Sequence, residues 1–332
     1  MKAFTKTLCA LLALVIAAGC GTASPSAPQS PPAATPPSAA VQSEAATLTF
    51  TDALGYEVSI KSHDRVVSLY GSFAETWVLA GGTLAGTTND AIKERKLELS
   101  DDVAIVGTTK EPNMEEILAL NPDFVILSAD TSEQVDMHNA LSTAKIPHAY
   151  YRVDTFSDYL AMLKQLCGMT GREDLYQKNG AEVQAQIDKV MTAVKKHTEK
   201  TPTALLIRAF SSGAKAKGDD NLAGVMLKDL GAENLVSKHE SLLEDVSMEE
   251  IISADPDFIF VVTMGASEEK ALGYMAESFL SNPAWAGLSA VKNDRYIILP
   301  KNLFHYKPNA KWGESYAYLA KILYPSIAAE IK

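Results

Sequence analysis

Two copies of one motif define the architecture of this chain. Residues 114–127 read MEEILALNPDFVIL, and residues 248–261, which lie 134 positions later, read MEEIISADPDFIFV. Seven of the fourteen aligned positions are identical, where chance gives about one, so two similar units are expected. Each copy predicts a short helix, a Pro-Asp turn and a continuously apolar strand. An apolar strand that follows a helix is typical of a parallel sheet covered on both faces.

Further strand and helix candidates surround both copies. Strands are predicted at residues 66–70, 103–106, 124–128 and 147–151 in the first half, and at 204–209, 258–263 and 296–299 in the second. Helices are predicted at residues 73–80, 158–167, 223–230 and 310–323. This alternation predicts an α/β fold of two lobes, residues 47–168 and 201–332.

The segment between the lobes, residues 169–200, has the pattern of one long helix. Its apolar residues recur at helical spacing: Leu175, Val183, Ile187, Val190, Met191 and Val194. A helix over residues 172–197 would be about 39 Å long. A single helix as the main connection predicts a stiff hinge and a modest closing motion.

The first nineteen residues have the form of a secretory signal. Lys2 and Lys6 precede an apolar run at residues 8–18, which is too short to span a bilayer of about 30 Å. The run ends in Ala-Ala-Gly-Cys at residues 17–20. This resembles a bacterial lipoprotein signal, in which Cys20 is lipidated and becomes the mature N-terminus. The alternative is an ordinary secretory signal with an incidental cysteine.

The composition of the next segment supports the same interpretation. Residues 21–46 contain six Pro, eight Ala, five Ser and one charge, so residues 20–46 are predicted to form an extended tether. We expect the body to sit on the outer face of a cell membrane through its lipid. Loss of residues 1–19 leaves 28 basic against 41 acidic residues, a net charge of −13. Such an acidic chain is a poor nucleic-acid binder, and Cys167, alone after processing, excludes an intramolecular disulfide or a multi-cysteine metal site.

Several short stretches then resemble one known family in the order in which they occur. They are Arg-Val-Val-Ser-Leu at residues 65–69 with Glu75, Leu-Ala-Gly-Gly at 79–82, Ile-Val-Gly at 105–107 leading into Asn-Met-Glu at 113–115, and Gly-Ala-Glu-Asn at 231–234. With the lipobox, the tether and the repeat, they resemble ABC-transporter substrate-binding lipoproteins of the iron-siderophore, haem and cobalamin group, over roughly residues 47–325.

The resemblance implies a fold and a role. The fold would be the class III periplasmic-binding fold, with two Rossmann-like lobes joined by one long α-helix. The role would be that of a monomer without a cofactor, which captures a small iron chelate and passes it to ABC permease and ATPase subunits. Haem and cobalamin remain alternative cargoes of the same fold, and a bare divalent metal is a third.

Each motif copy carries two adjacent glutamates at the start of its helix. Asn113 and Ser247 are predicted helix caps, and Glu116 and Glu250, three places on, complete a capping-box pattern. Glu115 and Glu249 lack that explanation. The resemblance implies that they dock against arginines of the permease, and the alternative is a favourable charge at a helix N-terminus. Glu75, inside the first helix, is interpreted as structural.

Ligands of open α/β sheets bind beyond the carboxyl ends of the strands. The loops expected there contribute the candidates Tyr70, Lys110, Arg152, Arg208, Phe210 and Lys215. Residues 301–312 add three Lys, no acid, and the candidates His305, Tyr306, Lys307 and Trp312. Aromatic and cationic side chains together favour an anionic, partly aromatic cargo such as a ferric siderophore. Core packing is the alternative for Trp312, and direct ligation of iron is left open for His305.

An enzyme is the main rival class. The chain has no Gly-x-Ser-x-Gly elbow and no His-Glu-x-x-His pair. Gly213 and Gly218 have the outer spacing of a phosphate loop, but Asp219 and Asp220 stand where its Lys and Ser/Thr belong. The histidines are scattered without the spacing of metal ligands. We therefore predict no catalytic residue and no metal site.

Overall fold

The computed structural model describes residues 47–197, 200–243, 246–265 and 267–331. Residues 45–332 form one compact unit, which contains both lobes. The predicted signal peptide, the predicted lipidation site Cys20 and the predicted tether all lie outside the described residues. Within the described ranges, no helix combines the length and apolar character needed to cross a membrane.

The first lobe is built on a five-stranded parallel sheet with the order β5-β4-β3-β6-β7. Its strands are β3 (Val66–Ser68), β4 (Leu84–Thr87), β5 (Ala104–Ile105), β6 (Phe124–Ser128) and β7 (His148–Tyr151). Its helices are α1 (Gly71–Leu79), α2 (Asp90–Lys93), α3 (Met114–Ala119), α4 (Ser132–Val135), α5 (His138–Thr143) and α6 (Phe156–Thr170). An antiparallel hairpin of β1 (Leu48–Thr51) and β2 (Glu57–Ile60) precedes them.

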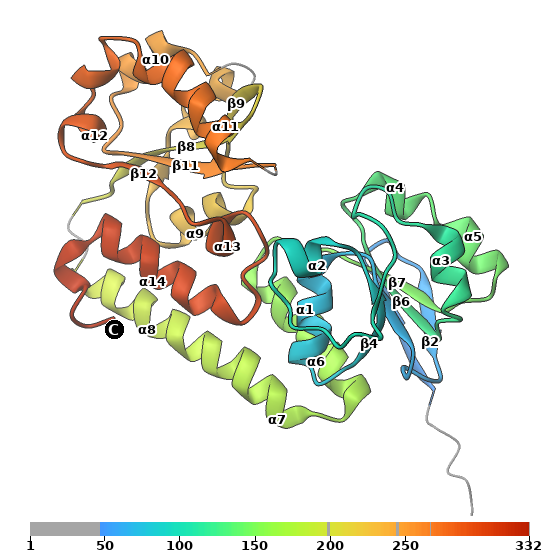
Figure 1. Cartoon of the computed structure of the whole chain (residues 1–332). Coiled ribbons are helices and arrows are strands. Elements are labelled where there is room, and N and C mark those ends of the chain that lie inside the picture. Colours follow the sequence, from blue (N-terminus) through green and yellow to red (C-terminus); the bar gives the residue numbers. More distant parts are fainter. Residues whose placement is uncertain (1–46, 198–199, 244–245, 266, 332) are drawn as a thin grey trace, which may run out of the picture. The chain divides into compact units, whose positions relative to one another are not determined.

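Strand β6 shows why its sequence is continuously apolar. All five of its residues are buried. Phe124 and Ile126 enter a core shared with α1 and α6, whereas Val125 and Leu127 enter a second core with α3 and α5. Figure 1 shows these two pairs of helices on opposite faces of the sheet. Successive side chains of a strand point to opposite faces, so a sheet covered on both sides requires apolar residues at every position.

The second lobe repeats this arrangement around β8. Its strands are β8 (Thr203–Phe210), β9 (Gly213–Ala216), β10 (Glu233–Asn234), β11 (Phe258–Thr263) and β12 (Tyr296–Ile298). Parallel pairing gives the order β10-β8-β11-β12, and β9 pairs with β8 in an antiparallel hairpin. The helices are α9 (Leu222–Asp229), α10 (Met248–Ala254), α11 (Glu268–Met275), α12 (Ser289–Lys292), α13 (Lys301–Phe304) and α14 (Trp312–Leu323), with short helical turns between them.

A continuous helical segment connects the lobes. It comprises α7 (Glu173–Tyr176), a π-helical stretch η1 (Gln177–Ala181) and α8 (Glu182–His197). α14 packs along α8, as Figure 1 also shows. The apolar side of α8 belongs to one core that contains residues of both sheets, for example Ile126 and Leu206. This shared core supports the expected stiffness of the hinge, because bending it would expose apolar surface.

The two motif copies occupy equivalent places in their lobes. β6 lies beside the central strand β3, and β11 lies beside β8. Asn121 and Asp255, just before the Pro-Asp turn, both have positive φ, which Asn and Asp tolerate better than most residues. The Asp123 carboxylate accepts hydrogen bonds from the amides of Asp64 and Arg65. The Asp257 carboxylate accepts one from the Thr203 amide at 3.0 Å. Each turn therefore anchors the start of the neighbouring strand.

All seven predicted strands are confirmed, with boundaries shifted by at most two residues. The sequence pattern missed the β1–β2 hairpin, β4, β9 and the two-residue strand β10. β4 reads LAGT and has no strong apolar signal. Lys215 was expected in a loop and instead lies in β9, because residues 203–216 fold as one hairpin.

Candidate ligand-binding site

Both motif helices present a glutamate at their first turn. The Asn113 side chain accepts hydrogen bonds from the amides of Glu115 and Glu116, and Ser247 accepts one from the Glu250 amide. Both caps are thus confirmed. Neither helix has the reciprocal half of a capping box; the Glu250 carboxylate instead accepts a bond from the Ser241 hydroxyl. Glu115 and Glu249 are exposed, so their carboxylates are accessible to a partner.

A pocket of about 460 Å³ lies where the carboxyl ends of both sheets contribute loops. Its first-lobe lining follows β3, β4, β5 and β6: Tyr70, Ser72, Asp90, Glu94, Thr109, Lys110, Asp130, Thr131, Ser132 and Glu133. Its second-lobe lining follows β11 and β12: Met264, Gly265, His305 and Tyr306. In each lobe the chain reverses its direction of strand addition next to the central strand, and this switch point is where open α/β sheets bind ligands.

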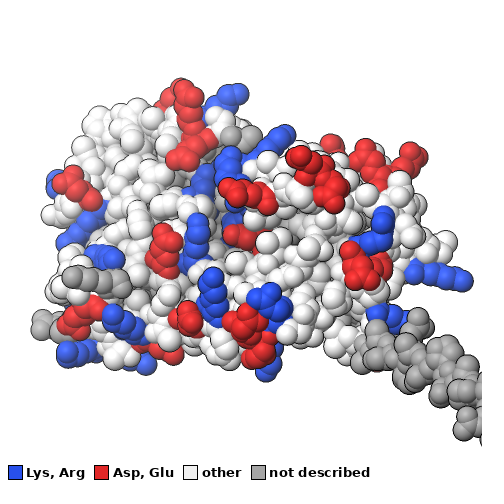
Figure 2. Space-filling model, turned by 60° about the horizontal axis from the view of Figure 1, so that its bottom comes forward, with Lys and Arg blue, Asp and Glu red and all other residues white. Residues whose placement is uncertain are grey.

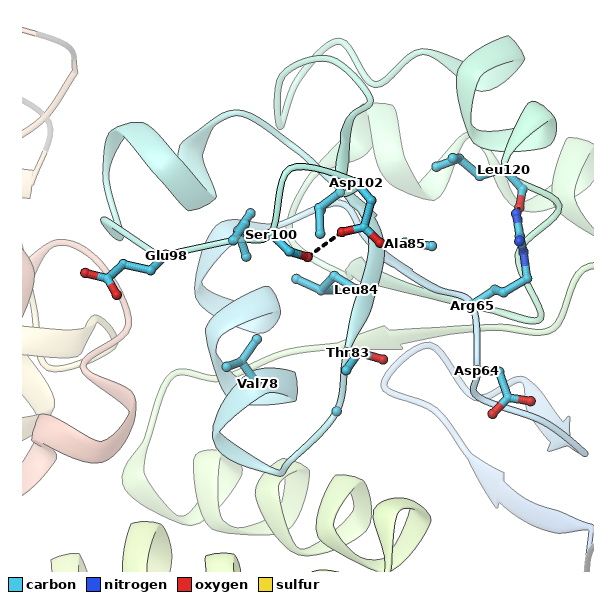
Figure 3. A pocket seen from close by; sticks show the side chains of 13 residues that line it. Asp64, Arg65, Val78, Thr83, Leu84, Ala85, Glu98, Ser100, Asp102 and Leu120 are labelled. Carbon is cyan, nitrogen blue, oxygen red and sulfur yellow. Dashed lines mark hydrogen bonds between the residues drawn. The ribbon is translucent and has the colours of Figure 1, made fainter.

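A larger pocket of about 540 Å³ lies at the opposite ends of the first-lobe strands (Figure 3). Asp64, Arg65, Thr83 and Val103 line it just before β3, β4 and β5 begin. In Figure 3 the Arg65 side chain extends toward Leu120, and its Nε donates to the Leu120 carbonyl at 2.9 Å. The Arg65 guanidinium is therefore bonded to the backbone at the C-terminal end of α3. We therefore place the candidate site in the pocket at the carboxyl ends.

The first-lobe side of the candidate pocket is acidic. We call Asp90, Glu94, Asp130 and Glu133 the acidic wall. Asp90 accepts hydrogen bonds from the Gly71 amide and the Thr88 hydroxyl. Burial and the nearby Asp90 raise the pKa of Glu94. Burial, followed by the negative charges of the acidic wall, raises the pKa of Tyr70 to about 12.

Cations lie near His305 on the second-lobe side, behind the residues that line the pocket. We call Arg208, Lys215, Lys217 and Lys301 the basic wall. Arg208 lies opposite Lys215 in the β8–β9 hairpin, and burial lowers the pKa of Arg208. Burial also lowers the pKa of Lys217, and the charges of Arg208 and Lys215 lower it further. The two basic stretches of the sequence are therefore close in space around the hairpin and His305.

His305 lies inside the pocket lining. Burial, with Lys301, Arg208 and Lys307 nearby, lowers its pKa to about 4. Its imidazole is consequently neutral at physiological pH, with a nitrogen lone pair that can accept a hydrogen bond or a metal.

The segment after α13 forms contacts between the lobes. Lys307 Nζ lies 3.2 Å from the Asp154 carboxylate, and the lysine side chain is only 15% exposed. The buried Asn309 amide donates to the Ser72 carbonyl and to Glu75 Oε2, both at 2.8 Å. Glu75 also pairs with Arg95. This confirms a structural role for Glu75.

The predicted site residues differ in their position relative to the pocket. Tyr70, Lys110, His305 and Tyr306 line the pocket. Arg208 and Lys215 belong to the basic wall beside it. Arg152 is outside the lining and pairs with Asp130, a member of the acidic wall, at 2.7 Å.

Three further predicted residues also lie outside the pocket lining. Lys307 is engaged by Asp154. Phe210 is half-buried over the β8–β9 turn, where its ring covers Gly213. Trp312 has no exposed surface and packs edge-on against Phe156 in the core. We leave Trp312 out of the proposed site, because a fully buried ring offers no surface to a cargo in this conformation.

Sequence reasoning missed the acidic wall. Asp90 and Glu94 follow β4, the strand that the pattern did not predict. A signal was available, because the helix at residues 73–80 required a returning strand before residue 103. Within the described residues, no three or more His, Cys, Asp or Glu side chains group as metal ligands.

Fold and site together define a two-lobed solute-binding protein. The family model described as periplasmic binding protein matches residues 66–303, which is more than half of the chain. The chain therefore belongs to the periplasmic binding protein family, as the sequence motifs indicated.

The relatives and solved structures agree with this assignment. The Fe(3+)-citrate-binding protein YfmC of Bacillus subtilis (strain 168) is 27% identical over 236 residues, covering 69% of this chain and 70% of that protein. The siderophore-binding protein BauB, solved with two molecules of acinetobactin and ferric iron, has a TM-score of 0.66 at 21% identity and covers 86% of this chain and 99% of that chain. S. aureus IsdE in complex with haem has a TM-score of 0.64 at 19% identity, with coverages of 78% and 98%. The expected class III periplasmic-binding fold is confirmed.

Proposed function

We propose that this protein is the extracytoplasmic solute-binding component of an ABC importer, and that it captures a ferric chelate and delivers it to a membrane permease. The observation that carries this proposal is the pocket lined by carboxyl-end loops of both lobes, in a chain whose relatives bind ferric citrate, siderophores and haem. The proposed role requires no chemical change in the cargo.

Capture follows from the two-lobed geometry. A cargo in this pocket contacts both lobes at once, so it favours the conformation in which both walls reach it. The Lys307–Asp154 pair and the Asn309 contacts already hold the lobes together. We expect only a small further movement on binding.

Haem is the second candidate cargo. His305 favours it, because a neutral imidazole in the pocket lining can supply an axial nitrogen to iron. Cobalamin is a third candidate, and only the expected fold supports it.

The proposal also includes attachment to the membrane and contacts with the other transporter subunits. Cys20 would carry the lipid that holds the body on the outer face of the membrane. Glu115 and Glu249, exposed on the first turns of α3 and α10, would contact the permease. ATP hydrolysis would occur on a separate subunit.

Binding to the purified body tests the proposal. Quenching of tryptophan fluorescence and the shift in melting temperature are measured with ferric siderophores, ferric citrate, haem and cobalamin. We expect saturable binding of at least one ferric siderophore. Arg208→Ala should weaken it about tenfold, because a guanidinium beside the pocket is lost. Lys311→Ala removes an exposed lysine of residues 301–312 that does not line the pocket, and should leave binding unchanged. Binding of none of these iron complexes would refute the proposal.

A further inference from the structure

We propose that the cargo is a ferric complex that carries a protonated amine in addition to anionic iron-binding oxygens, and that the acidic wall binds the amine. This inference deepens the proposed function and rests on it, because it concerns the chemical class of cargo for the same pocket. The composition of the loops at residues 301–312 had pointed only to a negatively charged cargo.

The pocket lining itself carries a negative charge. Of its fourteen residues, four are acids and one, Lys110, is a lysine. With His305 neutral, the lining has a net charge of −3. A cargo of uniformly negative charge would be repelled by this side of the pocket, because like charges across a binding site disfavour association. Asp90 is half-buried, and Glu94, Asp130 and Glu133 are exposed at the pocket surface.

The four acidic residues line the same pocket although they come from two separate segments. Asp90 and Glu94 follow β4, and Asp130 and Glu133 follow β6. The Tyr70 phenol lies within electrostatic reach of Asp90, Asp130 and Glu94 at the same time. An ammonium group placed beside Tyr70 would therefore be attracted by several carboxylates at once.

Cations of the protein do not fully neutralise the acidic wall. The Asp130–Arg152 pair is solvent-exposed, with side-chain exposures of 41% and 47%. Asp90 is bonded by neutral donors. Lys301, Arg95 and a hydrogen bond from Tyr306 lower the pKa of Glu94, but burial and Asp90 outweigh them and the net shift is upward. Lys110 is the cation that acts on Glu133. Much of the negative charge is thus left for a cargo to balance.

The basic wall supplies the opposite half of the recognition. Arg208 is half-buried, its Nε has no hydrogen-bond partner in the described part of the chain, and its register partner is Lys215. A guanidinium in this position suits hydroxamate, catecholate or carboxylate oxygens. A complex with an ammonium group at one end and such oxygens at the other matches both walls.

A rival explanation is that the two walls attract each other directly and thereby stabilise lobe closure. The two explanations differ in one respect. Direct attraction between the walls affects every cargo equally, whereas amine recognition distinguishes two complexes that differ only in the charge of an amine.

Matched ferric complexes make that distinction. One pair is ferrioxamine B, a trihydroxamate with a pendant ammonium group, and its N-acetylated form. The other pair is a ferric bis-catecholate built on a triamine, with its amine free or acetylated. Affinities are measured by fluorescence quenching for the wild-type protein, for Glu94→Gln/Glu133→Gln and for Glu98→Gln. Glu98 is exposed on the same segment and lines the larger pocket instead.

We expect the free amine to improve affinity about tenfold in at least one pair, in the wild-type protein and in Glu98→Gln. The preference should fall below about threefold in the double variant. Equal binding of free and acetylated forms, or equal weakening of both by the double variant, overturns the inference. So does binding of ferric citrate or haem with neither pair bound, which leaves the proposed function standing. Binding of no iron complex at all overturns the proposed function, and this inference with it.

Discussion

His305 lines the pocket as a neutral imidazole, because burial and three nearby cations lower its pKa to about 4. Such a shift couples protonation to folding. The same imidazole in the unfolded chain titrates near 6.5. Between these two values the unfolded chain binds a proton that the folded chain does not, so the free energy of unfolding rises with pH across the window from about 4 to 6.5.

Replacing this residue should remove that part of the pH dependence. Lowering the pH from 7 to 4.5 is expected to reduce the free energy of unfolding of the wild-type protein by about 2 kcal/mol more than that of His305→Gln. Urea denaturation at both pH values measures the difference. Titration of the carboxylates is common to both proteins and cancels in the comparison. Parallel pH profiles for the two proteins would contradict a depressed pKa at His305.

At the residue scale, sequence reasoning predicted types of side chain better than their partners. Tyr70, Lys110, His305 and Tyr306 were predicted for the pocket and line it. Lys307 comes from the same basic loop, yet its charge is taken by Asp154, 153 positions away. Nothing in the local sequence indicates that pairing, because it depends on how the two lobes meet.

At the scale of the elements, the two Pro-Asp turns have the same role in the two lobes, which is to anchor a neighbouring strand. The carboxylates of Asp123 and Asp257 hold the first residues of the strands next to β6 and β11. Identity between the motif copies at these aspartates is thereby explained by strand anchoring.

Asp123→Ala and Asp257→Ala should each lower the free energy of unfolding by about 2 kcal/mol. Asp123→Ala leaves two backbone amides without their charged acceptor, and Asp257→Ala leaves the amide and hydroxyl of Thr203 without theirs. Asp123→Asn should lose less, since its carbonyl oxygen can still accept a bond. Asp101→Ala, at an exposed turn, should change stability by less than about 0.5 kcal/mol. Urea denaturation of the four variants compares them, and equal effects at Asp101 and Asp123 would argue against anchoring.

At the scale of the whole molecule, the distribution of charged side chains around the pocket differs from that on the face shown in Figure 2. Acidic and basic side chains are interspersed over the face in Figure 2, in a chain with a net charge of −11. Around the pocket, by contrast, acids follow β4 and β6 whereas cations border His305. The exposed glutamates of α3 and α10 are a third feature, placed on both lobes by the repeated motif.

Transport tests whether those glutamates dock. Glu115→Ala with Glu249→Ala is expected to leave affinity for the iron complex unchanged and to reduce uptake at least tenfold, because neither side chain lines the pocket. Glu116→Ala and Glu269→Ala are matched controls at exposed first-turn positions and should transport normally. Uptake of a radioactive iron complex by cells or proteoliposomes measures the effect. Normal uptake by the double variant would mean that these charges only stabilise their helices.

The amino-acid sequence by itself determined the two α/β lobes, the connecting helix and the family, because apolar periodicity and the repeated motif are local properties. Only the tertiary structure decided which charges share the pocket. It brought Asp90 and Glu94 beside Asp130 and Glu133, placed Arg208 near His305, and buried Trp312 in the core. The physical reason is that strand order and lobe packing bring residues together across long stretches of chain, and no local pattern records that proximity.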